Sequence, residues 1–345
     1  MNEIVRRGRH TTFRLATALV VALLVTLVLN AQAQDLDSGR LILGTIQSTT
    51  APETLAANEF ANWIEEETDG RFQVTVVPAA QLGPALEQYE HTQTGAQHLF
   101  VDALEWNGQF VEDYGVLAVP FGLQSVEHLV AVLESELGDE WRQRMEDEYN
   151  LVTLSDQLVR SPRVVHAVER VETPDDMRGM PFRVPEIDVY FESWRAIGVS
   201  PTPVAWGEKY FALQQGVIRG GEGPFTTLYP MRFTEVSEYI LETNHLYSMN
   251  TLVMHKGTFD RLSEEDQRIF TEVAQRTAEY YTELVGDLED EHREQMASEH
   301  GVTFVEPSEE ALEQFRTLVG DAVADFEARG MWSEGLYEQV QAIGE

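Results

Sequence analysis

The chain has 345 residues, a formal net charge of −35 and no cysteine. The absence of cysteine excludes disulfides, thiolate metal sites and a thiol nucleophile. A strongly acidic surface repels nucleic acid and anionic lipid, so we expect neither as a partner. Lysine is limited to Lys209 and Lys256, and this acidic, lysine-poor composition hints at a halophilic source.

Residues 1–33 have the pattern of a secretory signal peptide. Four arginines and a net positive charge precede an uncharged apolar run from Leu15 to Leu29, and Ala31 and Ala33 provide a small-residue cleavage site. A retained membrane anchor is the alternative, but the run is shorter than the roughly 20 residues that span a bilayer comfortably. We therefore expect a periplasmic protein with no membrane insertion after cleavage.

The remaining chain, roughly 310 residues, is longer than one core usually serves, which predicts two domains. Helix-like and strand-like patterns alternate along it. The predicted strands are 40–46, 72–77, 99–101, 116–121 and 151–154, and the predicted helices are 50–68, 85–94, 126–134 and 139–148. Such alternation predicts a largely parallel sheet, and residues 164–246 repeat it as a second α/β lobe.

One long helix is predicted from Ser263 to about Ser298. Ser263 and Asp266 form a capping-box-like start, and apolar residues then recur at helical spacing. At 1.5 Å per residue the helix is on the order of 50 Å long, so we expect it to cross both lobes. Because no low-complexity linker separates the lobes, we expect crossing strands to join them.

Arg183 is a single cation within a β-like apolar run, between Phe182 and Val184. An unpaired buried charge is very costly, so this guanidinium needs an anion. Its planar fork suits a carboxylate, which it can hold through two parallel hydrogen bonds. A carboxylate of a ligand is therefore a candidate partner.

Several segments, in this order and spacing, resemble the solute-binding proteins of TRAP transporters (tripartite ATP-independent periplasmic transport), of the DctP-like family. The resemblance covers nearly the whole mature chain. Its segments are EETDGRFQVTVVPAAQLG (66–83), VLAVPFGL (116–123), TPDDMRGMPFRVPE (173–186), SPTPVAWGEKYFALQQGV (200–217), GEGP (221–224) and EVSEYILETNH (235–245), followed by the long helix.

The resemblance implies an α/β, two-lobe periplasmic-binding-protein fold with strand hinges and a long helix spanning both lobes. Lobe I would comprise residues 34–160 and about 249–288, and lobe II residues 161–248 and about 289–345. The two lobes would close on one small carboxylate, and the protein would deliver it to the small and large TRAP membrane subunits. No cofactor, no metal and no enzymatic activity are implied.

The resemblance also implies roles for individual residues. Arg183 matches the arginine that grips the ligand carboxylate, and Trp206 the aromatic residue that packs against the ligand. Arg163 matches a second basic residue, with Arg160 as a nearby competitor. Gly223 stands where the family pattern has a ligand-binding asparagine, so the ligand is expected to differ from that of the best-known relatives.

Each of these residues could instead have a purely structural role. Arg183 could pair with one of the many acids, such as Glu186, and Arg163 or Arg160 could belong to a loop. At the strand end of the early lobe where some relatives carry a polar group, this chain has Ile46 beside Gln47, so the resemblance points to Gln47. Asp102, Glu105 and Trp106 follow an apolar strand, where α/β sheets place their crevice residues, and they can contact a ligand or lie in a solvated loop.

No G-x-S-x-G elbow, H-E-x-x-H motif, phosphate loop or EF-hand loop occurs in the sequence. The function we expect is that of an extracytoplasmic receptor for a small organic acid, which hands it to a TRAP transporter. A receptor that feeds a signalling partner and an exported hydrolase are the alternatives.

Overall fold

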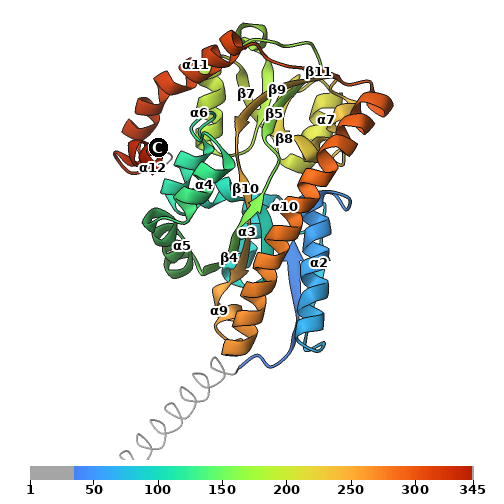
Figure 1. Ribbon diagram of the computed structural model, residues 1–345, viewed down its shortest axis with the longest axis vertical. Coiled ribbons are helices and arrows are strands. Elements are labelled where there is room, and N and C mark those ends of the chain that lie inside the picture. Colours follow the sequence, from blue (N-terminus) through green and yellow to red (C-terminus); the bar gives the residue numbers. More distant parts are fainter. Residues whose placement is uncertain (1–34, 344–345) are drawn as a thin grey trace, which may run out of the picture.

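The computed structural model describes residues 35–343, in which the chain forms two lobes, each built on one β-sheet (Figure 1). The predicted signal peptide lies outside the described residues. We call lobe I the half with the five-stranded sheet, of order β2-β1-β3-β10-β4, and lobe II the half with the six-stranded sheet, of order β11-β9-β5-β8-β6-β7. The α/β two-lobe fold is thereby confirmed.

The strands of lobe I are β1 (Gly39–Gly44), β2 (Phe72–Val77), β3 (Leu99–Ala103), β4 (Leu151–Val159) and β10 (Met249–His255). Those of lobe II are β5 (Arg163–Ala167), β6 (Pro181–Val184), β7 (Ser200–Pro203), β8 (Gly220–Pro224), β9 (Tyr239–Leu246) and β11 (Thr303–Val305). Both sheets are mixed, which corrects the expectation of a largely parallel sheet. β10 runs antiparallel to β3 and β4, and β5 runs antiparallel to β8 and β9, because the chain passes between the lobes and returns.

The helices surround the sheets. Their bounds are α2 (Pro52–Glu67), α3 (Ala85–Thr94), α4 (Val126–Leu133), α5 (Glu136–Tyr149), α6 (Asp188–Ile197), α7 (Lys209–Gln214), α8 (Phe225–Leu228), α9 (Lys256–Phe259), α10 (Glu264–His300), α11 (Glu309–Ala328) and α12 (Leu336–Ile343). Short 3₁₀ helices are η1 (Leu104–Gln109), η2 (Glu112–Ala118), η3 (Pro174–Met177), η4 (Trp206–Glu208) and η5 (Phe233–Glu235). Within residues 35–343, no helix is both long and apolar enough to cross a membrane.

The long helix α10 runs the length of the molecule, as Figure 1 shows in orange. Its 37 residues begin after Ser263, whose side chain accepts a hydrogen bond from the amide of Asp266. In lobe I the helix packs on α2 and β4, and further along it contacts α8 of lobe II. At 1.5 Å per residue it is about 55 Å long, so it supports both lobes.

Two strand connections cross between the lobes. β4 leads into β5 through residues 160–162, and β9 returns to β10 through residues 247–248. The amide of Arg160 donates to the carbonyl of Ser248, at 3.1 Å, and ties the two crossings together. The predicted crossing strands are therefore present.

Candidate functional site

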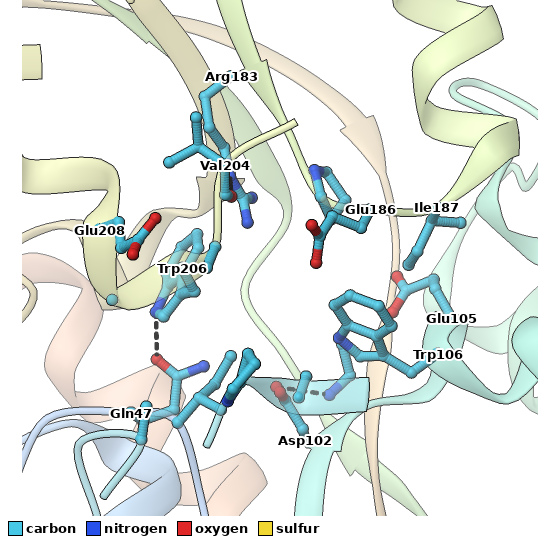
Figure 2. Close-up of a pocket in the computed structure, with 18 of the residues that line it drawn as sticks. Gln47, Asp102, Glu105, Trp106, Arg183, Glu186, Ile187, Val204, Trp206 and Glu208 are labelled. Carbon is cyan, nitrogen blue, oxygen red and sulfur yellow. Dashed lines mark hydrogen bonds between the residues drawn. The ribbon is translucent and has the colours of Figure 1, made fainter. Parts of the chain in front are cut away.

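A cavity of about 370 Å³ lies between the lobes, and it falls within the size range of small-molecule sites. The segment that follows β1, the segment 79–85, the end of β3 and helix η1 form its lobe I wall. Strand β6, the start of α6 and the η4 segment form its lobe II wall, and Arg160 and Arg163 line the cavity from the crossing β4–β5 and the start of β5. Figure 2 shows Arg183 and Trp206 of lobe II facing Gln47 and Asp102 of lobe I.

Arg183 is buried on β6, with 3% of its surface exposed, and it lines the cavity. Its Nε donates to the carbonyl oxygen of Val204, at 2.9 Å, and its guanidinium carbon lies 5.2 Å from the centre of the Trp206 ring. Within residues 35–343, no carboxylate forms an ion pair with Arg183, so the pairing with Glu186 is not made. Burial lowers the pKa of Arg183 to about 10, which still leaves a cation at neutral pH.

Arg163, on β5, also lines the cavity, but it already has a partner. Its Nε and Nη2 donate to the two carboxylate oxygens of Glu222 on β8, at 2.5 and 2.7 Å. Burial alone would raise the pKa of Glu222, but Arg163 beside it holds that pKa well below its usual value. Arg163 is thus neutralised within the protein, whereas Arg183 is not.

Arg160 lies in the first crossing and borders the cavity. Its Nη2 is 3.7 Å from a carboxylate oxygen of Glu53 on α2, and its Nε and Nη1 are buried without a hydrogen-bond partner in the described chain. Buried polar groups are almost always satisfied, so the N–H groups of these two nitrogens are available to a ligand.

Trp206 covers one side of the cavity at the start of η4. Its indole Nε1 donates to Oε1 of Gln47, at 2.9 Å, and this hydrogen bond bridges the lobes (Figure 2). Lys209 lies on the ring with its Nζ 4.7 Å from the centre and donates to the carbonyl of Glu222. The indole therefore contacts the guanidinium of Arg183 and the amine of Lys209. Burial lowers the pKa of Lys209 well below its usual value, so Arg183 is the cation on this side of the ring.

Gly223 does not line the cavity. A Cβ added there would lie 3.1 Å from Cη2 of Trp206, so the glycine leaves room for the indole ring. Gly221, on the same strand, allows Lys209 an equally close approach, since an added Cβ would lie 2.9 Å from its Cε. Gly221 and Gly223 of β8 thus leave the space that Lys209 and Trp206 occupy.

Two carboxylates, Asp102 at the end of β3 and Glu105 on η1, stand on the lobe I wall. One oxygen of Asp102 accepts from the amide of Ala103 at 2.8 Å, and one oxygen of Glu105 accepts from the hydroxyl of Tyr190 at 3.4 Å. Burial raises the pKa of Asp102 to about 6. The same wall includes Trp106, which lies beside Glu105 in Figure 2.

Most of the residues predicted from the sequence meet at this cavity. Those that line it are Gln47, Asp102, Glu105, Arg160, Arg163, Arg183 and Trp206. Sequence reasoning missed Tyr190 of α6, which lines the cavity one helical turn after Ile187, and Glu222, which pairs with Arg163. The spacing of Ile187 and Tyr190, both after the RVPE segment, is the signal that could have found Tyr190.

Comparisons with known proteins agree with this architecture. A solute-binding protein of Roseobacter denitrificans is 30% identical over 313 residues, which are 90% of this chain and 92% of that protein. The crystal structure of a TRAP periplasmic solute-binding protein from Roseobacter denitrificans with bound L-galactonate matches with a TM-score of 0.81 and 29% identity, over 89% of this chain and 98% of that one.

A second such structure, from Chromohalobacter salexigens with bound D-glucuronate, matches with a TM-score of 0.82 and 26% identity, over 88% of this chain and 99% of that one. The family model of the bacterial extracellular solute-binding proteins, family 7, matches residues 43–329. The chain therefore belongs to the bacterial extracellular solute-binding proteins of family 7.

Proposed function

We propose that the protein is a receptor that binds a small organic acid between its lobes and delivers it to the membrane subunits of a TRAP transporter. The observation that carries this proposal is Arg183, a buried cation at the cavity wall without a carboxylate partner in the described chain. A ligand carboxylate would neutralise it with charge-assisted hydrogen bonds. Structures of relatives contain L-galactonate, D-erythronate or D-glucuronate, which all carry one carboxylate.

The mechanism we propose is closure of the lobes about the two strand crossings. A ligand that touches both walls stabilises the closed arrangement through contacts that an open one lacks. Lobe I would comprise 34–160 and about 249–288, and lobe II 161–248 and about 289–345. Trp206 would cover the carbon skeleton of the acid while Arg183 sets its direction.

Substitution of Arg183 tests the proposal. We expect Arg183→Met to weaken binding of an acid identified by thermal-shift screening by about 2–5 kcal/mol, which is roughly thirty-fold or more, because the anion loses its buried partner. Calorimetric titration measures the loss. Arg219→Met is the matched control, because Arg219 pairs with Glu169 on the surface and does not line the cavity. Equal affinity of Arg183→Met and the wild type would contradict the proposal.

Delivery and location belong to the same proposal. We propose that residues 1–33 direct export to the periplasm and that the protein releases its ligand chemically unchanged. Membrane subunits encoded beside the gene would support transport, and a sensor kinase alone would support a signalling role. Recovery of unaltered acid after hours with the protein separates a receptor from a hydrolase.

A further inference from the structure

The lobe I wall of the cavity contains two carboxylates, and in each of them only one oxygen accepts a hydrogen bond from residues 35–343. Asp102 and Glu105 are both 2% exposed. Oδ2 of Asp102 and Oε2 of Glu105 have no hydrogen-bond partner within the described residues. A buried acceptor without a partner is costly, so these two oxygens are suited to receive donors from a bound molecule.

Arg160 adds donors to the same wall. Its Nε and Nη1 are buried and unpartnered, and the charge of Arg160 influences Asp102. A carboxylate would satisfy only the arginine, and an ammonium group only the acids. A hydroxyl group both donates and accepts, so it satisfies both kinds of group at once.

Among the described residues, the lobe II wall presents an unpaired positive charge. There Arg183 has an unmatched positive charge, and its other neighbours are a carbonyl oxygen and the Trp206 ring. Figure 2 shows Arg183 at one end of the cavity and Asp102 and Glu105 toward the other. Within the described chain the two walls therefore differ: lobe II presents an unpaired cation, whereas lobe I presents two unpaired carboxylate oxygens together with the unpaired N–H groups of Arg160.

We infer that the solute is a hydroxylated monocarboxylate, and that Asp102 and Glu105 determine specificity by excluding acids with a second carboxylate at the far end. This inference rests on the proposed function, because it assumes that the first carboxylate binds Arg183. Like charges brought together in a buried interface are strongly unfavourable, so a dicarboxylate in this orientation would meet two repelling groups. The one cation that the described chain places on that wall, Arg160, already faces the carboxylate of Glu53, with 3.7 Å between Nη2 and Oε1, so it does not offset both.

Two matched pairs of acids test the inference. L-Galactonate and galactarate share one carbon skeleton, and galactarate differs in that its terminal CH₂OH is oxidised to a carboxylate. D-Erythronate and meso-tartrate form a shorter pair of the same kind. We expect the wild-type protein to bind at least one hydroxymethyl acid, and to bind its dicarboxylate counterpart roughly a hundred-fold or more weakly in calorimetry.

The variant Asp102→Asn/Glu105→Gln keeps the shape of both side chains and removes their charges. The ratio that we compare is the affinity for the hydroxymethyl acid divided by the affinity for its dicarboxylate counterpart. We expect this ratio to be at least about ten-fold smaller in the double variant than in the wild type, because the two side chains no longer repel the second carboxylate. Asp113→Asn is the matched control: Asp113 is buried and accepts from Ser333, outside the cavity. We expect the control to keep the wild-type ratio, and circular dichroism checks that each variant is folded.

The outcomes separate the inference from the function on which it rests. Equal or tighter binding of the dicarboxylate by the wild type, or a ratio that the double variant leaves unchanged, overturns the inference and leaves the receptor function intact. Binding of succinate or alanine together with failure of all four acids also overturns it. If no organic acid binds at all, the proposed function itself fails.

Discussion

Arg163 and Arg183 come from the two strands that flank β8, and both reach the same cavity. Glu222 of β8 accepts two hydrogen bonds from Arg163, and its carboxylate neutralises the charge of that arginine. Removal of Glu222 would leave two unmatched cations in the cavity wall, and such buried charges are costly. We therefore expect Arg163, whose charge Glu222 already neutralises, to contribute less to the binding of a ligand carboxylate than Arg183 does.

The pKa of Asp102, raised to about 6 by burial, predicts a pH-dependent selectivity. Below about pH 6 Asp102 is protonated and no longer repels a second carboxylate, whereas free carboxyl groups of the solute titrate near pH 4 and stay ionised. We expect the affinity for galactarate, relative to L-galactonate, to rise roughly ten-fold between pH 7.5 and pH 5. Titration calorimetry at several pH values measures this ratio.

The groups around Asp102 that carry or can carry charge are Glu53 on α2, Tyr89 on α3, Glu105 on η1, Arg160 in the β4–β5 crossing and Arg183 on β6. The Asp102→Asn variant is the control, and we expect its ratio to vary less with pH than that of the wild type. A ratio that is flat from pH 7.5 to pH 5 in the wild type would contradict the assignment.

The positions of the lobe I residues were predictable, but their partners were not. Gln47 and Asp102 follow or end neighbouring parallel strands, and such strand ends gather at one edge of a sheet. The pairing of Arg163 with Glu222 depends on the antiparallel register of β5 and β8, in which Val165 lies opposite Glu222. A local sequence pattern contains no information on that register.

At the scale of elements, periodicity located most helices and strands. Strand 72–77 and helix 85–94 have the predicted bounds. The apolar run 116–121 was predicted as a strand, but residues 112–118 form the 3₁₀ helix η2. A short buried apolar run does not distinguish a strand from a buried helical turn, because both are apolar on every side.

Substitution of Gly223 tests whether strand β8 holds the Trp206 ring in place. We expect Gly223→Ala to destabilise the protein by about 1–3 kcal/mol and to weaken acid binding, because the new methyl group would press on Trp206. Thermal unfolding and calorimetry measure the two effects.

Gly286→Ala, in α10, is the control for that variant. An added Cβ there meets no other atom within 4 Å, and alanine favours a helix over glycine. We expect unchanged binding and a stability that is equal or higher by up to about 1 kcal/mol. Wild-type stability and affinity of Gly223→Ala would show that β8 does not fix the indole.

At the scale of the whole molecule, two lobes and a spanning helix follow from chain length, alternation and the length of the last helical pattern. The mixed sheets do not follow from these. β10 belongs to lobe I although it comes after five of the six strands of lobe II, β5 to β9, and it inserts between β3 and β4. Only the return crossing gives this order, and no local pattern specifies it.

The net charge of −35 predicts an effect of salt on the rate of binding. An anionic acid is repelled by the acidic surface at long range, and salt shortens that range to about 10 Å at 0.1 M. We expect the association rate to rise several-fold between roughly 10 and 500 mM NaCl, with little change in the dissociation rate, because the cavity contacts are buried. Stopped-flow measurements separate the two rates. A fall of the association rate with salt would show that the arginines of the cavity dominate the field at its mouth.

The hydrogen bond between Gln47 and Trp206 joins the lobes without using any atom of a solute. Its contribution, about 1 kcal/mol for an ordinary hydrogen bond, is therefore the same for every compound held between the lobes. A term common to all candidates cancels when two of them are compared. The link helps weak and strong binders alike, so the receptor's preference for one acid must come entirely from groups that touch the acid itself.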